Sequence, residues 1–338
     1  MGQLRTTDAR AHRAAAEGAQ SSAAPHPYRG FALRAALGLG LLAFLLHRFG
    51  GSAVFSLLSR ERPGYFAAAV ALSVAGQVMT AYRWRLLAAV VSIRGPFREF
   101  VGYYFVGLFT NLFVPGMVGG DAARALYLGR RHGRLGPAVA SVVADRGIGL
   151  IALLWFAAAA AWLINDGALP LTVTRPTIAI GMVAFAAYIA APLIARIEKF
   201  MPHRLERYAA LITPYLHRPA TLIPPIVLAL LLHASVVIAQ YILALGLSLS
   251  IPLSVFMLCV PIAGVFASLP LTLNGLGLRE GAYAVLFGMF GVANADAVAL
   301  GLLCFASSVV LGLTGTLPFL VMETPALRRG EGAEMSVP

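Results

Sequence analysis

Long, nearly uncharged apolar stretches alternate with short polar segments along the chain. Between Arg218 and Arg279 there are 60 consecutive residues without Asp, Glu, Lys or Arg. A window of about 18 or more such residues is long enough to cross the hydrocarbon core of a bilayer. The pattern therefore predicts an all-α polytopic membrane protein. Further charge-free windows cover 65–82, 100–120, 147–165 and 176–195.

The pattern predicts six full spans and two broken apolar segments. The broken segments, 97–120 and 253–291, contain Pro and Gly in their interiors, and these residues interrupt helices. The expected transmembrane domain is 31–323, with a disordered cytoplasmic tail at 1–30 and a second cytoplasmic tail at 324–338. The six expected spans cover 33–50, 64–91, 138–164, 177–196, 221–246 and 296–322.

The distribution of Arg and Lys indicates that segment 97–120 enters and leaves the membrane on the same side. With this topology 21 of the 26 basic residues lie in the cytoplasm, as the positive-inside rule requires. A crossing segment would instead place the Arg-rich stretch 124–134 outside. We therefore expect a re-entrant hairpin, with both termini on the cytoplasmic side of the cell inner membrane. The loop around Arg60 and Arg62 is more basic than this topology favours.

An internal repeat is expected because the two broken segments align with each other. Placing Phe109 over Phe266, an offset of 157, matches Gly120 with Gly277. With one extra span between the halves, the second copy is inverted in the membrane. Paired Gly/Pro-interrupted segments in inverted halves are typical of a substrate site at the repeat interface.

The stretch "NLFVPGMVGGDAAR", residues 111–124, holds the most specific candidate site. Irregular backbone at membrane depth is tolerated where it lines a polar cavity or is buried in protein. We expect Asp121 to cap a helix that begins at Ala122, and the Gly119–Gly120 pair to let a ligand approach the backbone. Arg124, one turn later, would meet an anionic group. The alternative is a kinked span with Asp121 as an ordinary cap.

Three further polar islands interrupt the apolar sequence. Arg83 lies near the inner end of a span, where it either snorkels to the interface or binds a headgroup. Asp145 and Arg146 either neutralise each other or join the site, and Arg279 and Glu280 follow the 60-residue charge-free run. The candidate substrate-binding residues are Arg83, Trp84, Asn111, Pro115, Gly119, Gly120, Asp121, Arg124, Asp145, Arg146, Asn274, Gly277, Arg279 and Glu280.

Composition limits the other classes of function. The net charge of +12 follows from loop arginines rather than from a nucleic-acid-binding motif, so nucleic acid is not an expected partner. The sequence has no metal-ligand spacing, cofactor motif or catalytic constellation. Cys259 and Cys304 lie in apolar runs, as packing residues do. His233 and Gln240, seven residues apart on one helix face, are expected to make interhelical hydrogen bonds.

Four motifs resemble the lysylphosphatidylglycerol synthase transmembrane-region family, also called the flippase-like family. They are "RWRLL", "NLFVPGMVGGDAAR", "VVADRGIGL" and "SLPLTLNGLGLREG", and the resemblance covers roughly residues 35–322. In full-length synthases a soluble aminoacyl-transferring domain follows this region. We expect that domain, and hence the synthase activity, to be absent from this chain.

The resemblance implies movement of a lipid with an anionic or polyprenyl-phosphate headgroup between leaflets. Its partners would be the bilayer, the lipid substrate and, in the same pathway, lipid-synthesis enzymes. The alternative is a membrane-embedded accessory protein or transferase in the synthesis of hopanoids, cardiolipin or glycolipids. The sequence does not choose among these lipids.

Overall fold

The computed structural model describes residues 43–44, 47, 51–113, 118–163, 170–196, 212–217, 219–267 and 277–321. Within these ranges the chain forms helices joined by turns, with no strand. The prediction of an all-α polytopic membrane protein is therefore confirmed. Of the candidate site residues, Pro115 and Asn274 lie outside the described residues.

Five described helical segments are long and apolar enough to span a membrane. Their ranges overlap five of the six expected spans, and almost all of the sixth, 33–50, lies outside the described residues. Prolines start two of these helices, α4 and α11, where the missing N–H would be unpaired in any case. The five segments are α4 (Pro63–Val90), α7 (Leu135–Leu163), α8 (Leu171–Ile189), Pro219–Gly246 with η2 (Pro219–Leu222) and α11 (Ile223–Gly246), and Asn294–Val321 with α14 (Asn294–Leu313).

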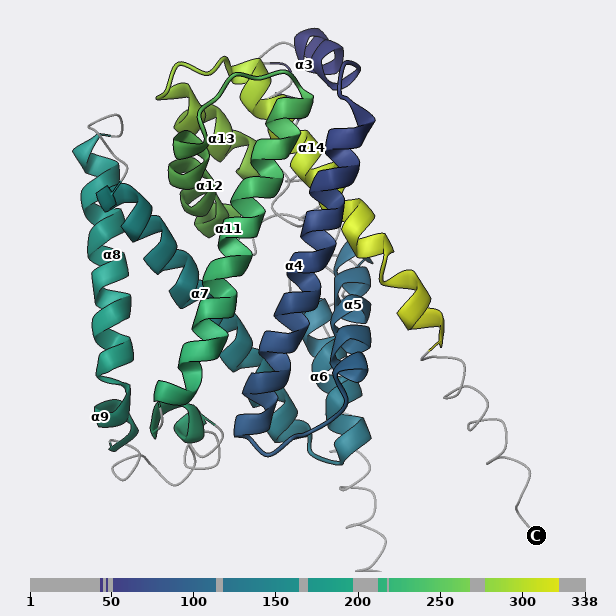
Figure 1. Cartoon of the computed structure of the whole chain (residues 1–338), viewed down its shortest axis with the longest axis vertical. Coiled ribbons are helices and arrows are strands. Elements are labelled where there is room, and N and C mark those ends of the chain that lie inside the picture. Colours follow the sequence, from purple (N-terminus) through teal and green to yellow (C-terminus); the bar gives the residue numbers. More distant parts are fainter. Residues whose placement is uncertain are drawn as a thin grey trace, which may run out of the picture.

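Four shorter helices form two hairpins. Helix α5 (Phe97–Phe113) packs against α6 (Val118–His132), and α12 (Leu253–Ala267) packs against α13 (Leu278–Gly288). At 1.5 Å per residue each of the four is about 26 Å long or less, which is too short to cross a bilayer core of about 30 Å. Figure 1 shows the α5–α6 hairpin and the α12–α13 hairpin in opposite halves of the molecule. Two further short helices are α3 (Gly51–Leu58) and α9 (Ala191–Arg196).

The turns that lead into the two hairpins have the same geometry. Among the described non-glycine residues, only Ser92 and Ser248 have positive φ, at 61° and 58°. Each serine follows the end of a long helix, α4 or α11, and the hairpin begins five residues later. The turns are closed by equivalent backbone bonds, from Ile93 N to Ala88 O at 3.0 Å and from Leu249 N to Ala244 O at 2.9 Å. The two turns are 156 residues apart, one residue from the sequence alignment.

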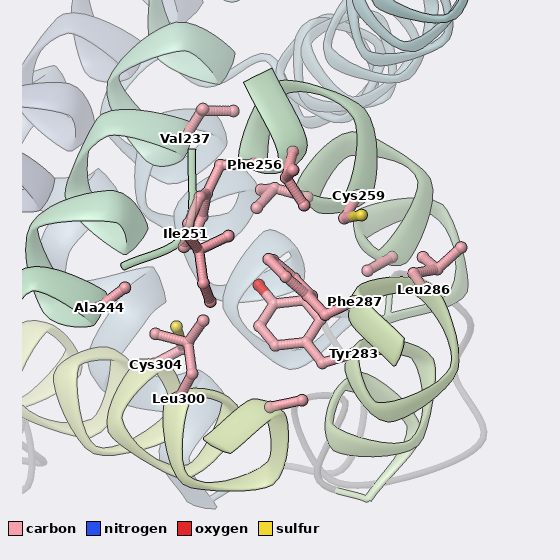
Figure 2. Packing of buried hydrophobic residues seen from close by; sticks show 14 of the residues in the cluster. Val237, Ala244, Ile251, Phe256, Cys259, Tyr283, Leu286, Phe287, Leu300 and Cys304 are labelled. Atoms are coloured by element: carbon pink, nitrogen blue, oxygen red, sulfur yellow. The ribbon is translucent and has the colours of Figure 1, made fainter. Parts of the chain in front are cut away.

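The long helices α4 and α11 lie side by side and hold the two halves together (Figure 1). Gly76 faces Leu232 and Ser235 on α11, and an added Cβ would be 3.0 Å from Leu232 Cδ1. Small residues of this kind let helices approach closely where the bilayer supplies no hydrophobic driving force. The largest core cluster joins α11, α12, α13 and α14 around Phe256 and Phe287, which meet edge to face (Figure 2).

Candidate functional site

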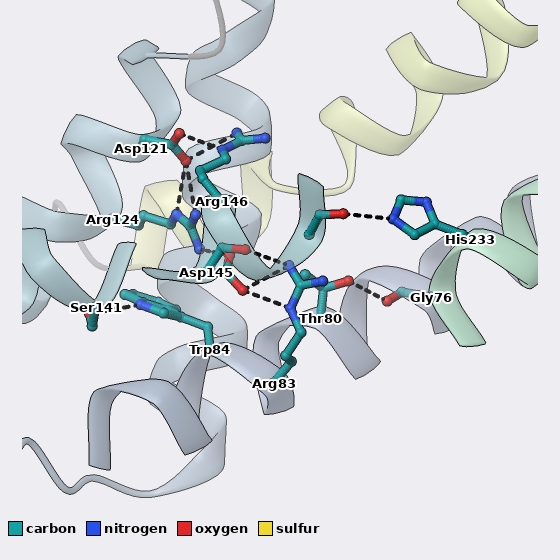
Figure 3. Close-up of polar contacts among 11 residues, drawn as sticks. Gly76, Thr80, Arg83, Trp84, Asp121, Arg124, Ser141, Asp145, Arg146 and His233 are labelled. Atoms are coloured by element: carbon teal, nitrogen blue, oxygen red, sulfur yellow. Dashed lines mark hydrogen bonds and ion pairs between the residues drawn. The ribbon is translucent and has the colours of Figure 1, made fainter. Parts of the chain in front are cut away.

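Asp145 is the buried centre of a charge network built from three helices (Figure 3). Its side chain on α7 is 2% exposed, and it pairs with Arg83 from α4 and Arg124 from α6. Oδ1 accepts a hydrogen bond from Arg83 Nε at 2.8 Å, and Oδ2 accepts one from Arg124 Nη1 at 2.9 Å. One carboxylate therefore fixes two guanidinium groups, and it joins α6 of the first hairpin to α4 and α7.

Asp121 extends the network toward the surface. It accepts hydrogen bonds from Arg124 Nε at 3.0 Å and from Arg146 Nε at 2.6 Å. The Arg146 side chain is 43% exposed, whereas that of Arg124 is 3% exposed. Acidic and basic side chains thus alternate from the buried Arg124, through Asp121, to the partly exposed Arg146.

Among the described side chains the network carries one positive charge in excess, because three guanidinium groups meet two carboxylates. Arg83 Nη1 is also buried without a hydrogen-bond partner. Buried charges are costly unless they are paired and hydrogen-bonded. An anionic group at this network would neutralise the excess charge.

Aromatic side chains hold the central arginine in place. The guanidinium of Arg124 lies over the rings of Trp84 and Tyr104, 4.9 and 5.0 Å from their centroids, as cation–π contacts require. Trp84 donates from Nε1 to Ser141 Oγ at 3.0 Å and packs edge-on against Phe100. The sequence prediction missed Tyr104 and Ser141, since each is one more polar or aromatic residue in an apolar helix.

The network lies well inside the long helices. Arg83 is seven residues from the end of α4, and Asp145 is ten residues from the start of α7, which corresponds to about 11 and 15 Å along the helix axes. Both helices qualify as membrane spans. Ionisable residues at such depth in a membrane protein mark functional sites by default.

Two predicted roles in the first hairpin are wrong. Helix α6 begins at Val118, so Asp121 is already inside the helix and is not its N-cap. Gly120 does not open the backbone to a ligand either: Gly120 N donates to Asn111 Oδ1 at 2.7 Å, and an added Cβ would overlap the carbonyl oxygen of Gly107. Gly120 is buried and Gly119 half-buried. At Gly120, at least, the absence of a side chain lets α5 and α6 pack closely.

At two other places the structure excludes one of the two alternatives that the sequence left open. Arg83 neither snorkels nor reaches the interface, because it is 4% exposed and pairs with Asp145. Asp145 and Arg146 are adjacent in sequence, yet their described ion pairs are with residues of other helices. The reason is geometric, since neighbours on a helix point about 100° apart and do not face each other.

The second hairpin holds its polar residues apart from this network. Gly277, with φ 82°, precedes α13, and Glu280 is 0% exposed and accepts a hydrogen bond from Gly277 N at 2.5 Å. Among the described contacts there is no ion pair between Glu280 and the half-buried Arg279. Helix α13 lies in the opposite half from α6 (Figure 1). The structure thus groups the candidates into two separate places.

The expected interhelical hydrogen bonds of α11 are confirmed. His233 Nε2 lies 3.0 Å from Gly149 O on α7, and Gln240 Oε1 accepts a hydrogen bond from the Tyr283 hydroxyl on α13. Between α7, α8, α12 and α13 lies a cavity of about 590 Å³, lined by apolar side chains and by Thr172 and Thr177. Its size is that of a small-molecule site, about 300–1,000 Å³.

No group of three or more His, Cys, Asp or Glu side chains suited to a metal ion occurs in the part of the chain that the structure describes. Neither a curated protein nor a solved structure matches the chain. A family model described as the lysylphosphatidylglycerol synthase TM region matches residues 31–315. The chain is therefore a multi-pass membrane protein that belongs to this family.

Proposed function

We propose that this protein is a lipid translocase that moves an anionic lipid between the leaflets of the inner membrane. The observation that carries the proposal is the buried network around Asp145, with its excess positive charge and its partly exposed end at Arg146. A purely structural network would gain from exact charge balance. The excess charge favours an anion as the missing member.

The arrangement of the hairpins supports a transport mechanism. Two long-helix–hairpin–long-helix units, with matching turns at Ser92 and Ser248 and hairpins in opposite halves, are the features of an inverted repeat with two re-entrant hairpins. Transporters with inverted repeats bind substrate near the midplane and move one repeat against the other. The buried depth of Asp145 is consistent with a binding site of that kind.

A headgroup phosphate would bind at the outer end of the network. There Asp121 shares its two oxygens between Arg124 and Arg146, and a phosphate presents the same bidentate acceptors to a guanidinium fork. Exchange of Asp121 for phosphate on Arg146 leaves Asp145 in place to hold Arg83 and Arg124. The lipid tails would remain in the bilayer and in the apolar cavity.

Leaflet exchange in vesicles tests the proposal. The purified protein is reconstituted into phosphatidylcholine vesicles with trace fluorescent phosphatidylglycerol, and bleaching from outside reports the inner-leaflet fraction. We expect Arg146→Ala to slow exchange about tenfold or more and Arg146→Lys to restore part of it, because charge is kept and the fork is lost. Arg130→Ala, which removes an exposed arginine from the last turn of α6, is the matched control.

Two results would argue against a translocase. If fluorescent phosphatidylglycerol exchanges no faster than in protein-free vesicles, the protein does not translocate this lipid. A chemically altered lipid in the same vesicles, detected by mass spectrometry, would favour a transferase in lipid synthesis. We do not expect chemistry at Asp121 or Asp145, because guanidinium groups engage the oxygens of both carboxylates.

A further inference from the structure

Glu280 is a fully buried carboxyl group with one oxygen unused. Oε2 accepts the N–H of Gly277 at the start of α13, at 2.5 Å. Oε1 is buried and has no hydrogen-bond partner, and the whole residue is 0% exposed. A buried charge without compensation is far more costly than a buried neutral group. The free oxygen therefore calls for a cationic partner or a proton.

The groups around Glu280 supply no cation that is paired with it. On α13, Arg279 makes no described ion pair, and the hydroxyl of Tyr283 is directed to Gln240 of α11. The titratable groups on the other helices of this cluster are the thiols of Cys304 on α14 and Cys259 on α12 and the hydroxyl of Tyr241 on α11, none of them a cation. Figure 2 shows Tyr283 and Cys304 among the side chains of the apolar cluster.

Helix packing and the lack of further ligands favour a proton over a metal ion at Glu280. Helix α14 passes directly over the carboxyl stem, so that a Cβ added at Gly301 would lie 2.9 Å from Glu280 Cγ. A metal ion would need several oxygen ligands, and the described part of the chain offers no cluster of acidic or imidazole groups here.

We propose that Glu280 is a proton-binding site and that the conformation described is its protonated state. Oε1 takes up one proton and the carboxylate becomes a neutral acid, with no other bond made or broken. Oε2 keeps the bond to Gly277. When the α12–α13 hairpin moves away from α14, the acid meets water or the neighbouring Arg279, and the proton leaves.

This site would couple proton binding to lipid movement, a step that rests on the proposed translocase function. A ligand that binds one conformation better shifts the population toward it. Acid pH therefore favours the conformation with the hairpin packed on α14, and alkaline pH favours the open one. Because a single group titrates, the population ratio changes by at most about tenfold per pH unit.

Infrared difference spectroscopy tests the proton site without any lipid movement. Spectra of the reconstituted protein are recorded across a pH titration. We expect the carbonyl band of a buried protonated carboxyl in the wild type and in Asp296→Asn, which removes a half-buried carboxylate from the first turn of α14. Glu280→Gln keeps an acceptor for Gly277 and should lack the band. The same band in Glu280→Gln would overturn the proposal.

Leaflet exchange across the same pH range tests the coupling. The wild type and Asp296→Asn are expected to change exchange rate with pH, and Glu280→Gln is expected to be flat. Identical pH profiles for the wild type and Glu280→Gln would overturn the coupling. If the wild type exchanges no lipid at any pH, the translocase proposal fails, and the infrared result still decides whether Glu280 binds a proton.

Discussion

At the scale of single residues, Asp145 is the side chain on which the charge network depends most. It compensates Arg83 and Arg124, both of which are buried. Asp145→Ala is expected to destabilise the protein by about 3–5 kcal/mol, because removal of one partner leaves buried charges unpaired. Thermal unfolding in detergent, followed by tryptophan fluorescence, measures the loss.

A surface ion pair provides the control for Asp145→Ala. Glu99 lies 3.7 Å from Arg131, whose side chain is 66% exposed, and exposed pairs contribute about 0–1 kcal/mol. Glu99→Ala should therefore change the unfolding temperature little. Equal losses for the two variants would mean that the buried network contributes no more than a surface pair does.

Glu61 gives a pH-dependent prediction outside the spans. Burial raises the pKa of its carboxyl, which lies against Gly246 at the end of α11. Because the folded-state pKa is the higher one, this group favours folding most at low pH, and the contribution is lost as pH rises through that pKa. Glu61→Gln should unfold at a slightly higher temperature than wild type at neutral pH, with no difference in acid. A gap that persists in acid would contradict this origin.

The sequence predicts which residues form the network but not how they pair. Arg83, Asp121, Arg124, Asp145 and Arg146 all stand out as charges in apolar surroundings. The partners of Asp145, however, are 62 and 21 residues away along the chain. Such pairings depend on how three helices pack, which no local motif contains.

At the scale of elements, the α5–α6 hairpin depends on a glycine contact. Gly120 packs against the backbone of Gly107, so Gly120→Ala is expected to destabilise the protein by about 1–3 kcal/mol through overpacking. Gly147 on α7 has open space around an added Cβ, and Gly147→Ala should be neutral or slightly stabilising. Thermal unfolding of both variants compares them, and similar stabilities would contradict close packing in the hairpin.

The Gly119–Gly120 pair explains why the sequence predicts the start of α6 at Ala122 and not at Val118. Glycine lowers helix propensity in water, so the Gly119–Gly120 pair reads as a break before Ala122. In a membrane protein small residues are favoured where helices meet, and the backbone bonds of the helix continue through both glycines from Val118. The described part of α6 thus begins four residues before the position expected from the sequence.

At the scale of the whole molecule, the two halves share geometry without sharing chemistry. Under the sequence offset of 157, Arg83 on α4 is equivalent to Gln240 on α11. Arg83 pairs with the carboxylate of Asp145, whereas Gln240 accepts a hydrogen bond from the Tyr283 hydroxyl. One half therefore carries a charged network and the other a neutral one. If the repeat is inverted, the charged network and the neutral one lie toward opposite sides of the membrane.

Membrane topology is the prediction on which that asymmetry depends. Arg130 lies in the last turn of α6 and Arg175 near the start of α8. Figure 1 shows these helix ends at opposite ends of the molecule. Under the positive-inside rule Arg130 is cytoplasmic and Arg175 is outside. Single Arg130→Cys and Arg175→Cys variants are treated with an impermeant maleimide, and both native cysteines are buried, so their background should be low. In intact cells we expect labelling at position 175 alone, and after permeabilisation at both. Labelling of position 130 in intact cells would mean that the α5–α6 segment crosses the bilayer, and the re-entrant hairpin would then be wrong.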